Sequence, residues 1–222
     1  MECKDMKKIY LLLLVLIGLH SYSYAQSIPK LKEKMMNFFC QTLKQNYGKA
    51  NGEAVAIMVE GLRNYKLHYI IDVDERKCKK INDELFASAL TNYFFNRDSS
   101  TVQTIILNKE NYDPYQPLIC ERYLMKPDKE TYYQKELQAS EHPFLKKVCH
   151  EYKLVGSEGI PIYFGYMMTN HLNCMDDFEK DEDIRMFMTL VFWRYLCYCA
   201  NIDFRTGDDK TDFIMKKMDG EN

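Results

Sequence analysis

Apolar residues recur with a helical period in two stretches of the chain. In residues 30–46 they return every three or four positions, and a glycine-containing YGKANGE segment follows. The same spacing runs from residue 81 to residue 94, before the polar segment NRDSS. Both patterns predict amphipathic helices that bury one face.

Other stretches have the short or alternating apolar pattern that is typical of β-strands. Residues 54–60 are a short apolar run and residues 65–72 alternate, so the GLRN between them suggests a β-hairpin. Residues 101–108 suggest another strand, and residues 153–168 suggest a second hairpin in which Pro161 indicates a strand edge or start. We therefore expect an α+β fold, with an antiparallel or mixed sheet built from β-hairpins and with long amphipathic and buried helices.

The C-terminal half adds helices of two kinds. Tyrosines and charges at mixed spacing between residues 119 and 152 predict two or three helices. Residues 184–200 are almost entirely apolar and follow three carboxylates at 181–183, which favour a helix N-terminus. We interpret this segment as a central buried helix, with a strand as the alternative. In such a helix Cys197 and Cys199 point about 200° apart, so they neither bond each other nor share a metal ion.

The N-terminal 25 residues have the layout of a secretory signal peptide. Three lysines precede an apolar run of about 11 residues, and the small-residue pattern SYA precedes Gln26. The run is shorter than the roughly 20 residues that a membrane-spanning helix needs. We therefore expect residues 1–25 to be removed on export to the periplasm or the extracellular space, with no transmembrane segment in the remaining chain. Residues 26–222 are predicted to form a single α+β domain, with a sub-boundary near residues 111–117 as the alternative.

Net charge gives no indication of a nucleic-acid partner. Removal of a segment with three lysines and two acidic residues changes the formal net charge from −2 to −3. A nucleic-acid-binding protein usually shows a basic excess instead. The partner is expected to be a protein or a small molecule, and no cofactor signature is present.

Seven cysteines remain after the predicted cleavage: Cys40, Cys78, Cys120, Cys149, Cys174, Cys197 and Cys199. An exported protein permits disulfides, so we expect one to three bridges. Because the number is odd, at least one thiol stays free or pairs between chains.

The strongest candidate metal site combines four residues of the types that bind zinc. Cys149 and His150 precede the second predicted hairpin, and His171 and Cys174 follow it. The hairpin would bring the two pairs close together. A disulfide between Cys149 and Cys174 explains the same spacing, and both interpretations stay open.

Other chemical motifs are weaker. The DVDE at residues 72–75 resembles the D-x-D metal-binding motif of sugar-nucleotide glycosyltransferases, but no glycine-rich loop accompanies it, and a solvated turn explains it. The acidic segments 176–183 and 203–212 lack the spacing of a calcium loop, and a helix start or a turn with a cap explains them. No serine, cysteine or zinc hydrolase signature occurs, although Cys120 or Cys149 together with His171 would supply a nucleophile and a base. The catalytic residues are therefore unassigned.

These observations predict an exported, non-enzymatic binding or interaction module. Its many tyrosines suit a recognition surface. The alternative is a small periplasmic hydrolase or zinc-dependent enzyme that uses the histidines and cysteines of the C-terminal half.

Overall fold

Helices dominate the part of the chain that the structure describes. The structure is a computed structural model, and it describes residues 27–63, 71–86, 93–94, 131–155 and 174–202. Helices account for 84% of these residues, among which there is no strand or sheet. The predicted α+β class, with its sheet of β-hairpins, is therefore wrong for the described part of the chain.

The clearest correction concerns residues 54–60, which were expected to form a strand. They lie inside helix α2 (Gly52–Arg63), whose buried apolar residues are Ala54, Val55, Met58 and Val59. This is the spacing of one helix face, because positions i, i+1, i+4 and i+5 lie on the same side. Of the second strand of that hairpin, residues 71–72 are not in a strand, and residues 65–70 lie outside the described part. The predicted strand at 101–108 lies outside it as well.

Both periodic segments form helices where the structure describes them. The first helix covers residues 27–47 and ends at Gly48, which has a φ of 73°, a conformation that favours glycine. The second segment, residues 81–94, begins within α3 (Glu75–Phe86) and ends with a helical pair at residues 93–94. The residues between these two parts lie outside the description.

The C-terminal half contains four described helices. α6 (Tyr132–Ala139) and α7 (Pro143–Val155) confirm the helices expected between residues 119 and 152, within the described range. Since α7 continues to Val155, the hairpin predicted to begin at residue 153 is wrong for residues 153–155, and its other residues lie outside the description. α9 (Cys174–Lys180) and α10 (Glu182–Cys199) follow.

Both ends of α10 are closed by residues with the appropriate chemistry. The Asp181 Oδ1 accepts a hydrogen bond from the Ile184 N–H at 3.0 Å, as an N-cap residue does. At the other end Asn201 has a φ of 56°, and the Ile202 N–H donates to the Cys197 carbonyl at 3.0 Å. This is a Schellman motif with asparagine in the position usually held by glycine. The helix predicted for residues 184–200 is confirmed by α10.

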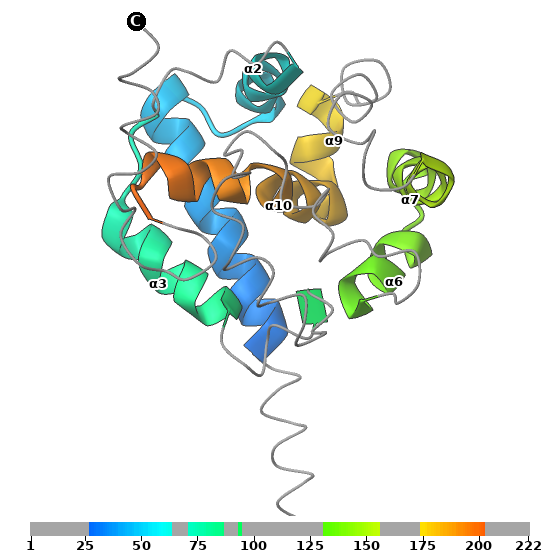
Figure 1. Ribbon diagram of the computed structural model, residues 1–222. Coiled ribbons are helices and arrows are strands. Elements are labelled where there is room, and N and C mark those ends of the chain that lie inside the picture. The colour runs from blue at the N-terminus through cyan, green and yellow to red at the C-terminus, as the bar shows by residue number, and fades with distance from the viewer. Residues whose placement is uncertain (1–26, 64–70, 87–92, 95–130, 156–173, 203–222) are drawn as a thin grey trace, which may run out of the picture.

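The core is built around α10, which lies in the middle of the helices in Figure 1. Thirteen of its eighteen residues are buried. The helix of residues 27–47 packs on it through Phe39, whose ring stacks on Phe192 at a centroid distance of 5.9 Å. α7 contributes Phe144, which meets the edge of Phe187 at 5.7 Å. α3 and α9 also pack against α10, and α2 packs against α9.

No helix in the described ranges is long and apolar enough to cross a membrane. The predicted signal peptide, residues 1–25, lies outside those ranges. The sub-boundary expected near residues 111–117 lies outside them too.

Candidate functional site

α3 presents one face to the core and the opposite face to solvent. Its first turn is closed by Asp74, whose Oδ1 accepts a hydrogen bond from the Lys77 N–H at 3.0 Å. The buried side chains of α3 recur every three or four residues: Cys78, Ile81, Asn82 and Leu85. A helix that packs by one stripe places its remaining, charged side chains on the outer face.

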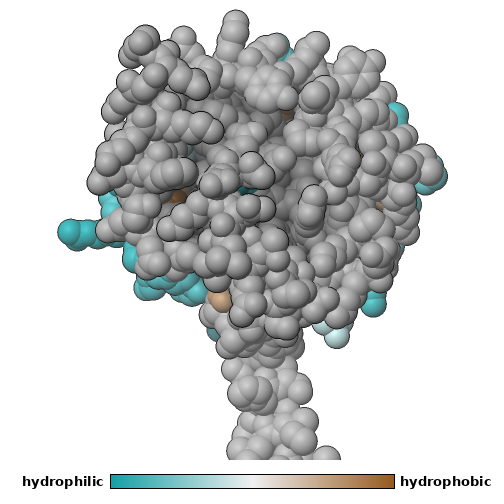
Figure 2. Space-filling model, viewed as in Figure 1, coloured by the Kyte–Doolittle hydropathy of each residue, from teal (hydrophilic) through white to brown (hydrophobic). Residues whose placement is uncertain are grey.

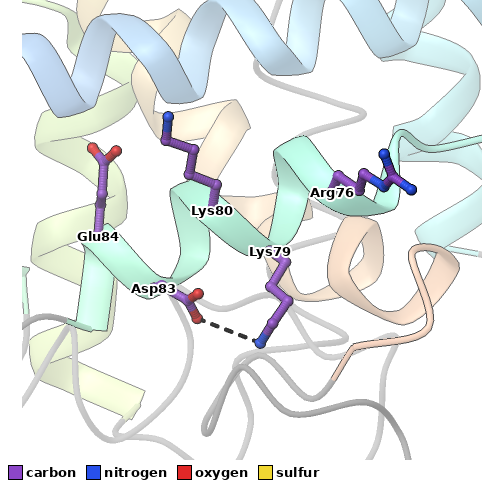
Figure 3. Close-up of a pocket in the computed structure, with 5 residues that line it drawn as sticks. All are labelled: Arg76, Lys79, Lys80, Asp83 and Glu84. Carbon is purple, nitrogen blue, oxygen red and sulfur yellow. Dashed lines mark ion pairs between the residues drawn. The ribbon is translucent and has the colours of Figure 1, made fainter.

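The outer face of α3 carries an open depression of about 540 Å³. The described residues that line it are all charged and all belong to this helix: Arg76, Lys79, Lys80, Asp83 and Glu84. Lys79 and Asp83 point to one side of the helix axis in Figure 3, and Lys80 and Glu84 point to the other. Figure 2 shows hydrophilic surface along the edge of the molecule where α3 lies in Figure 1.

Ion pairs neutralise both carboxylates of this depression. The Asp83 Oδ1 lies 3.9 Å from the Lys79 Nζ, and the Glu84 Oε2 lies 2.6 Å from the Nζ of Lys34 on the neighbouring helix. Arg76 and Lys80 are exposed, and no described residue forms an ion pair with either of them. The face therefore presents two positive charges that the described protein groups leave uncompensated, and we call Arg76 and Lys80 the cationic pair.

The buried face of α3 shares a polar network with α10. The Trp193 Nε1–H donates a hydrogen bond to the Asn82 Oδ1 at 2.9 Å, and the Cys197 Sγ lies 3.5 Å from the same oxygen. The Cys78 Sγ in turn lies 3.9 Å from the Cys197 Sγ. All four side chains are fully buried. These polar contacts satisfy groups that would otherwise destabilise the core, and they fix how α3 sits on α10.

No disulfide joins the described cysteines, which corrects the expected bridges. Cys40, Cys78, Cys149, Cys197 and Cys199 are all unbridged, so no disulfide forms among them. The two sulfurs that touch, those of Cys78 and Cys197, are 3.9 Å apart, whereas a disulfide needs about 2.05 Å. Cys78, Cys149 and Cys197 are buried in the helical core, where a thiol packs as a small apolar group and needs no bridge.

The predicted zinc residues are only partly within the described structure. Cys149 and His150 lie on α7, where Cys149 is buried and His150 is exposed, since adjacent helical residues point about 100° apart. His171 and the side chain of Cys174 lie outside the description, so the four-residue site stays a prediction. The described residues contain no group of three or more His, Cys, Asp or Glu side chains that would hold a metal ion.

One histidine contact was not expected from the sequence. The His142 Nε2 lies 3.6 Å from the Asp177 Oδ2 of α9, and its Nδ1 accepts the Phe144 N–H at 3.2 Å. Both ring nitrogens are thus engaged at the start of α7. We interpret His142 as a residue that closes the first turn of α7 and joins it to α9.

The free thiol of Cys40 is a weak nucleophile. Burial raises the pKa of the Cys40 thiol, and the positive charge of Arg185 lowers it by a smaller amount. Because the thiolate is the reactive form, a raised pKa leaves little of it at neutral pH.

The acidic motifs within the described residues serve as helix starts and as links between helices, and the segment 203–212 lies outside those residues. In the DVDE segment Asp74 closes α3, and the Asp72 Oδ2 accepts a hydrogen bond from the Gln45 Nε2 at 2.6 Å. In the segment 176–183, Asp181 is the N-cap of α10.

No protein-family model, curated protein or solved structure matches this chain. The charged face of α3 is the feature of the described structure that suggests a binding function.

Proposed function

We propose that the protein is an exported, non-enzymatic binding module that holds an acidic segment of a partner protein against the outer face of α3. The observation that carries the proposal is the cationic pair, Arg76 and Lys80. Both side chains are exposed, and both line the depression. The carboxylates beside them are already paired with Lys79 and Lys34.

The spacing of the cationic pair suits a polypeptide. Arg76 and Lys80 are four residues apart, so their Cβ atoms lie about 5–6 Å from each other on one side of the helix. The lining from Arg76 to Glu84 covers about 12 Å of helix at a rise of about 1.5 Å per residue. An extended or helical acidic segment can place carboxylates at both positions at once.

The shape of the depression favours the same class of partner. Sites for small molecules are usually concave and cover most of the ligand surface. The described lining residues all belong to one helix, so these residues by themselves do not enclose a small ligand. A partner that lies along the helix needs no enclosure.

Exposed ion pairs are weak, which sets the expected affinity. Each contributes about 0–1 kcal/mol, and screening over a Debye length of about 8 Å at physiological salt reduces it further. The cationic pair therefore contributes more to the association rate and to the choice of partner than to overall affinity. Salt-sensitive binding is the signature that we expect.

Export is the second part of the proposal. It is supported by the three lysines, the apolar run and the SYA before Gln26. N-terminal sequencing of the protein recovered from outside the cytoplasm is expected to begin at Gln26. An intact N-terminus on the exported protein would contradict cleavage at this point.

The binding test uses a dye-labelled oligoglutamate peptide, with oligolysine as the peptide control. Fluorescence anisotropy is expected to show binding of oligoglutamate at low salt and several-fold weaker binding at about 0.15 M salt. The double substitution Arg76→Glu and Lys80→Glu is expected to abolish it. No oligoglutamate binding by the unaltered protein at low salt would overturn the proposal.

The control substitution is Lys30→Glu with Lys44→Glu. Both lysines are exposed on the helix of residues 27–47, and the change in net charge is the same. Binding is expected to persist in this variant. Equal loss in the two double variants would mean that total charge, and not the face of α3, holds the peptide.

A further inference from the structure

Two cysteine side chains from different helices touch in the core. Cys78 lies on α3 and Cys197 on α10, and their sulfur atoms are 3.9 Å apart. Both side chains are fully buried, and neither forms a disulfide. A pair of unbridged thiols held at contact distance by two helices is a preformed pair of soft ligands.

The separation of the sulfurs fits two ligands of one ion. Metal–thiolate bonds are about 2.3 Å long, as in zinc sites, so sulfurs bound to one ion lie no more than about 4.6 Å apart. The observed 3.9 Å corresponds to a sulfur–metal–sulfur angle of about 116° at that bond length. This angle is close to trigonal geometry.

An oxygen donor lies beside the sulfur of Cys197. The Asn82 Oδ1 is 3.5 Å from the Cys197 Sγ, and the Trp193 Nε1–H holds it in place at 2.9 Å. Two thiols and one neutral oxygen are three donors, whereas structural zinc sites take four protein ligands. Thiolate ligands in a low coordination number suit Cu(I).

We infer that Cys78, Cys197 and Asn82 form a binding site for Cu(I) between α3 and α10. Binding of one Cu(I) ion replaces the two thiol protons, which leave to solvent, and the resulting bis-thiolate complex carries a charge of −1. Arg194, which is also buried, lies one turn before Cys197 on α10. Neighbours at this spacing lie on adjoining parts of the helix surface, and a cation there favours the thiolate form.

The first test is a Cu(I) titration of the full protein in ascorbate against a chromophoric Cu(I) chelator. One equivalent is expected to bind, and the emission of Trp193 is expected to change, because this is the only tryptophan of the chain and it contacts Asn82 directly. Cys78→Ser and Cys197→Ser are each expected to weaken Cu(I) binding by more than about 100-fold, which exceeds the effect of losing an outer-shell partner.

The matched control is Cys199→Ser. Cys199 lies two residues after Cys197 and is only partly buried, so it points to another side of α10 and its replacement is expected to leave binding unchanged. Equal weakening by Cys199→Ser would overturn the site. Zn²⁺ that binds in competition with Cu(I) at comparable affinity would overturn the choice of ion.

X-ray absorption of the unaltered protein tests the same site without any substitution. Two sulfur neighbours and one light-atom neighbour of copper are expected, and a shell of three or more sulfurs would contradict the assignment. Peptide mapping of protein isolated without reductant supplies a further check. Cys78 and Cys197 linked to each other in that sample would show that the pair is not available to a metal ion.

Discussion

α3 and α10 touch each other, yet they relate to solvent in opposite ways. α3 buries four of its twelve residues and carries charges on the rest of its surface. α10 buries thirteen of its eighteen residues, including Thr189 and Arg194. The first is a covering helix, and the second is the element that the other helices surround.

This difference determines what each helix can do. On α10 nearly every position is constrained by packing, so variation there affects stability first. On α3 the constraints stop at one stripe, and the outer face can change without disturbing the core. A binding surface is therefore more easily carried on α3, and the polar contacts of Asn82 join α3 to α10.

The strongest test of this contrast is Trp193→Ala on α10. Trp193 is fully buried, and its ring meets Phe38 at a centroid distance of 6.0 Å. Loss of such a side chain is expected to lower the free energy of unfolding by about 3–5 kcal/mol. The loss is measured by urea unfolding with circular dichroism as the probe, because the variant has no tryptophan whose fluorescence could report unfolding.

The matching substitution on α3 is Asp83→Ala. Asp83 is exposed, and its ion pair with Lys79 is long, at 3.9 Å. The expected change is within about 0.5 kcal/mol. If the two substitutions cost the same, the division into a covering helix and a surrounded helix would be wrong.

The two helices also differ in how their sequences predict them. The helical period of residues 81–94 shows a buried stripe directly, and α3 follows it. In residues 184–200 apolarity on all sides predicts burial without showing which side meets which neighbour. Residues 54–60 misled the prediction because a short apolar run is common to strands and buried helices. The signal missed there was Asn51, whose Oδ1 accepts the Ala54 N–H at 3.4 Å as a helix N-cap.

The hydrogen bond between Asn82 and Trp193 joins the two helices. Asn82→Ala removes the acceptor of the Trp193 Nε1–H and is expected to cost about 1–3 kcal/mol, because it leaves a buried donor unsatisfied. In a Trp193→Phe background that donor is already absent. Asn82→Ala is therefore expected to cost less there, with a coupling energy of about 0.5–3 kcal/mol in a double-mutant cycle.

The control cycle pairs Asn82→Ala with Tyr132→Ala. Tyr132 is 64% exposed on α6, and no described contact links it to Asn82. The two effects are expected to add within about 0.5 kcal/mol. Coupling of equal size in both cycles would mean that the effect spreads through the whole protein and does not belong to the Asn82–Trp193 bond.

The candidate sites were less predictable than the helices. The charges of α3 are visible in the sequence, but net charge conceals a local cationic pair in an acidic protein. Cys78 and Cys197 are 119 residues apart, so no local pattern indicates that they meet. Sequence spacing instead indicated Cys149, His150, His171 and Cys174. Their proximity depended on a predicted hairpin, and the first residues of that hairpin belong to α7.

The smallest expected effect is at the N-terminus of α3, where the cap is exposed. The Lys77 N–H bond to Asp74 lowers the pKa of this carboxyl from its ordinary value of 3.8, and the Lys77 ammonium at 3.5 Å adds to the lowering. A folded-state pKa below the unfolded one means that the charged cap stabilises the fold above about pH 3.8. This stabilisation is lost as the pH falls further, through the lower pKa of the folded state.

Carboxyl NMR titration of the folded protein is expected to place the Asp74 pKa below 3.8. Lys77→Met is expected to raise it only part of the way, since the backbone N–H bond, which is the larger cause, remains. Asp74→Asn is expected to keep α3 capped, because asparagine caps helices as well as aspartate does, while the pH dependence from this position disappears. An Asp74 pKa at or above 3.8 would mean that this carboxylate does not cap the exposed start of α3. The charged side of α3 would then contribute nothing to the stability of the helix at its N-terminus, and only its buried stripe would.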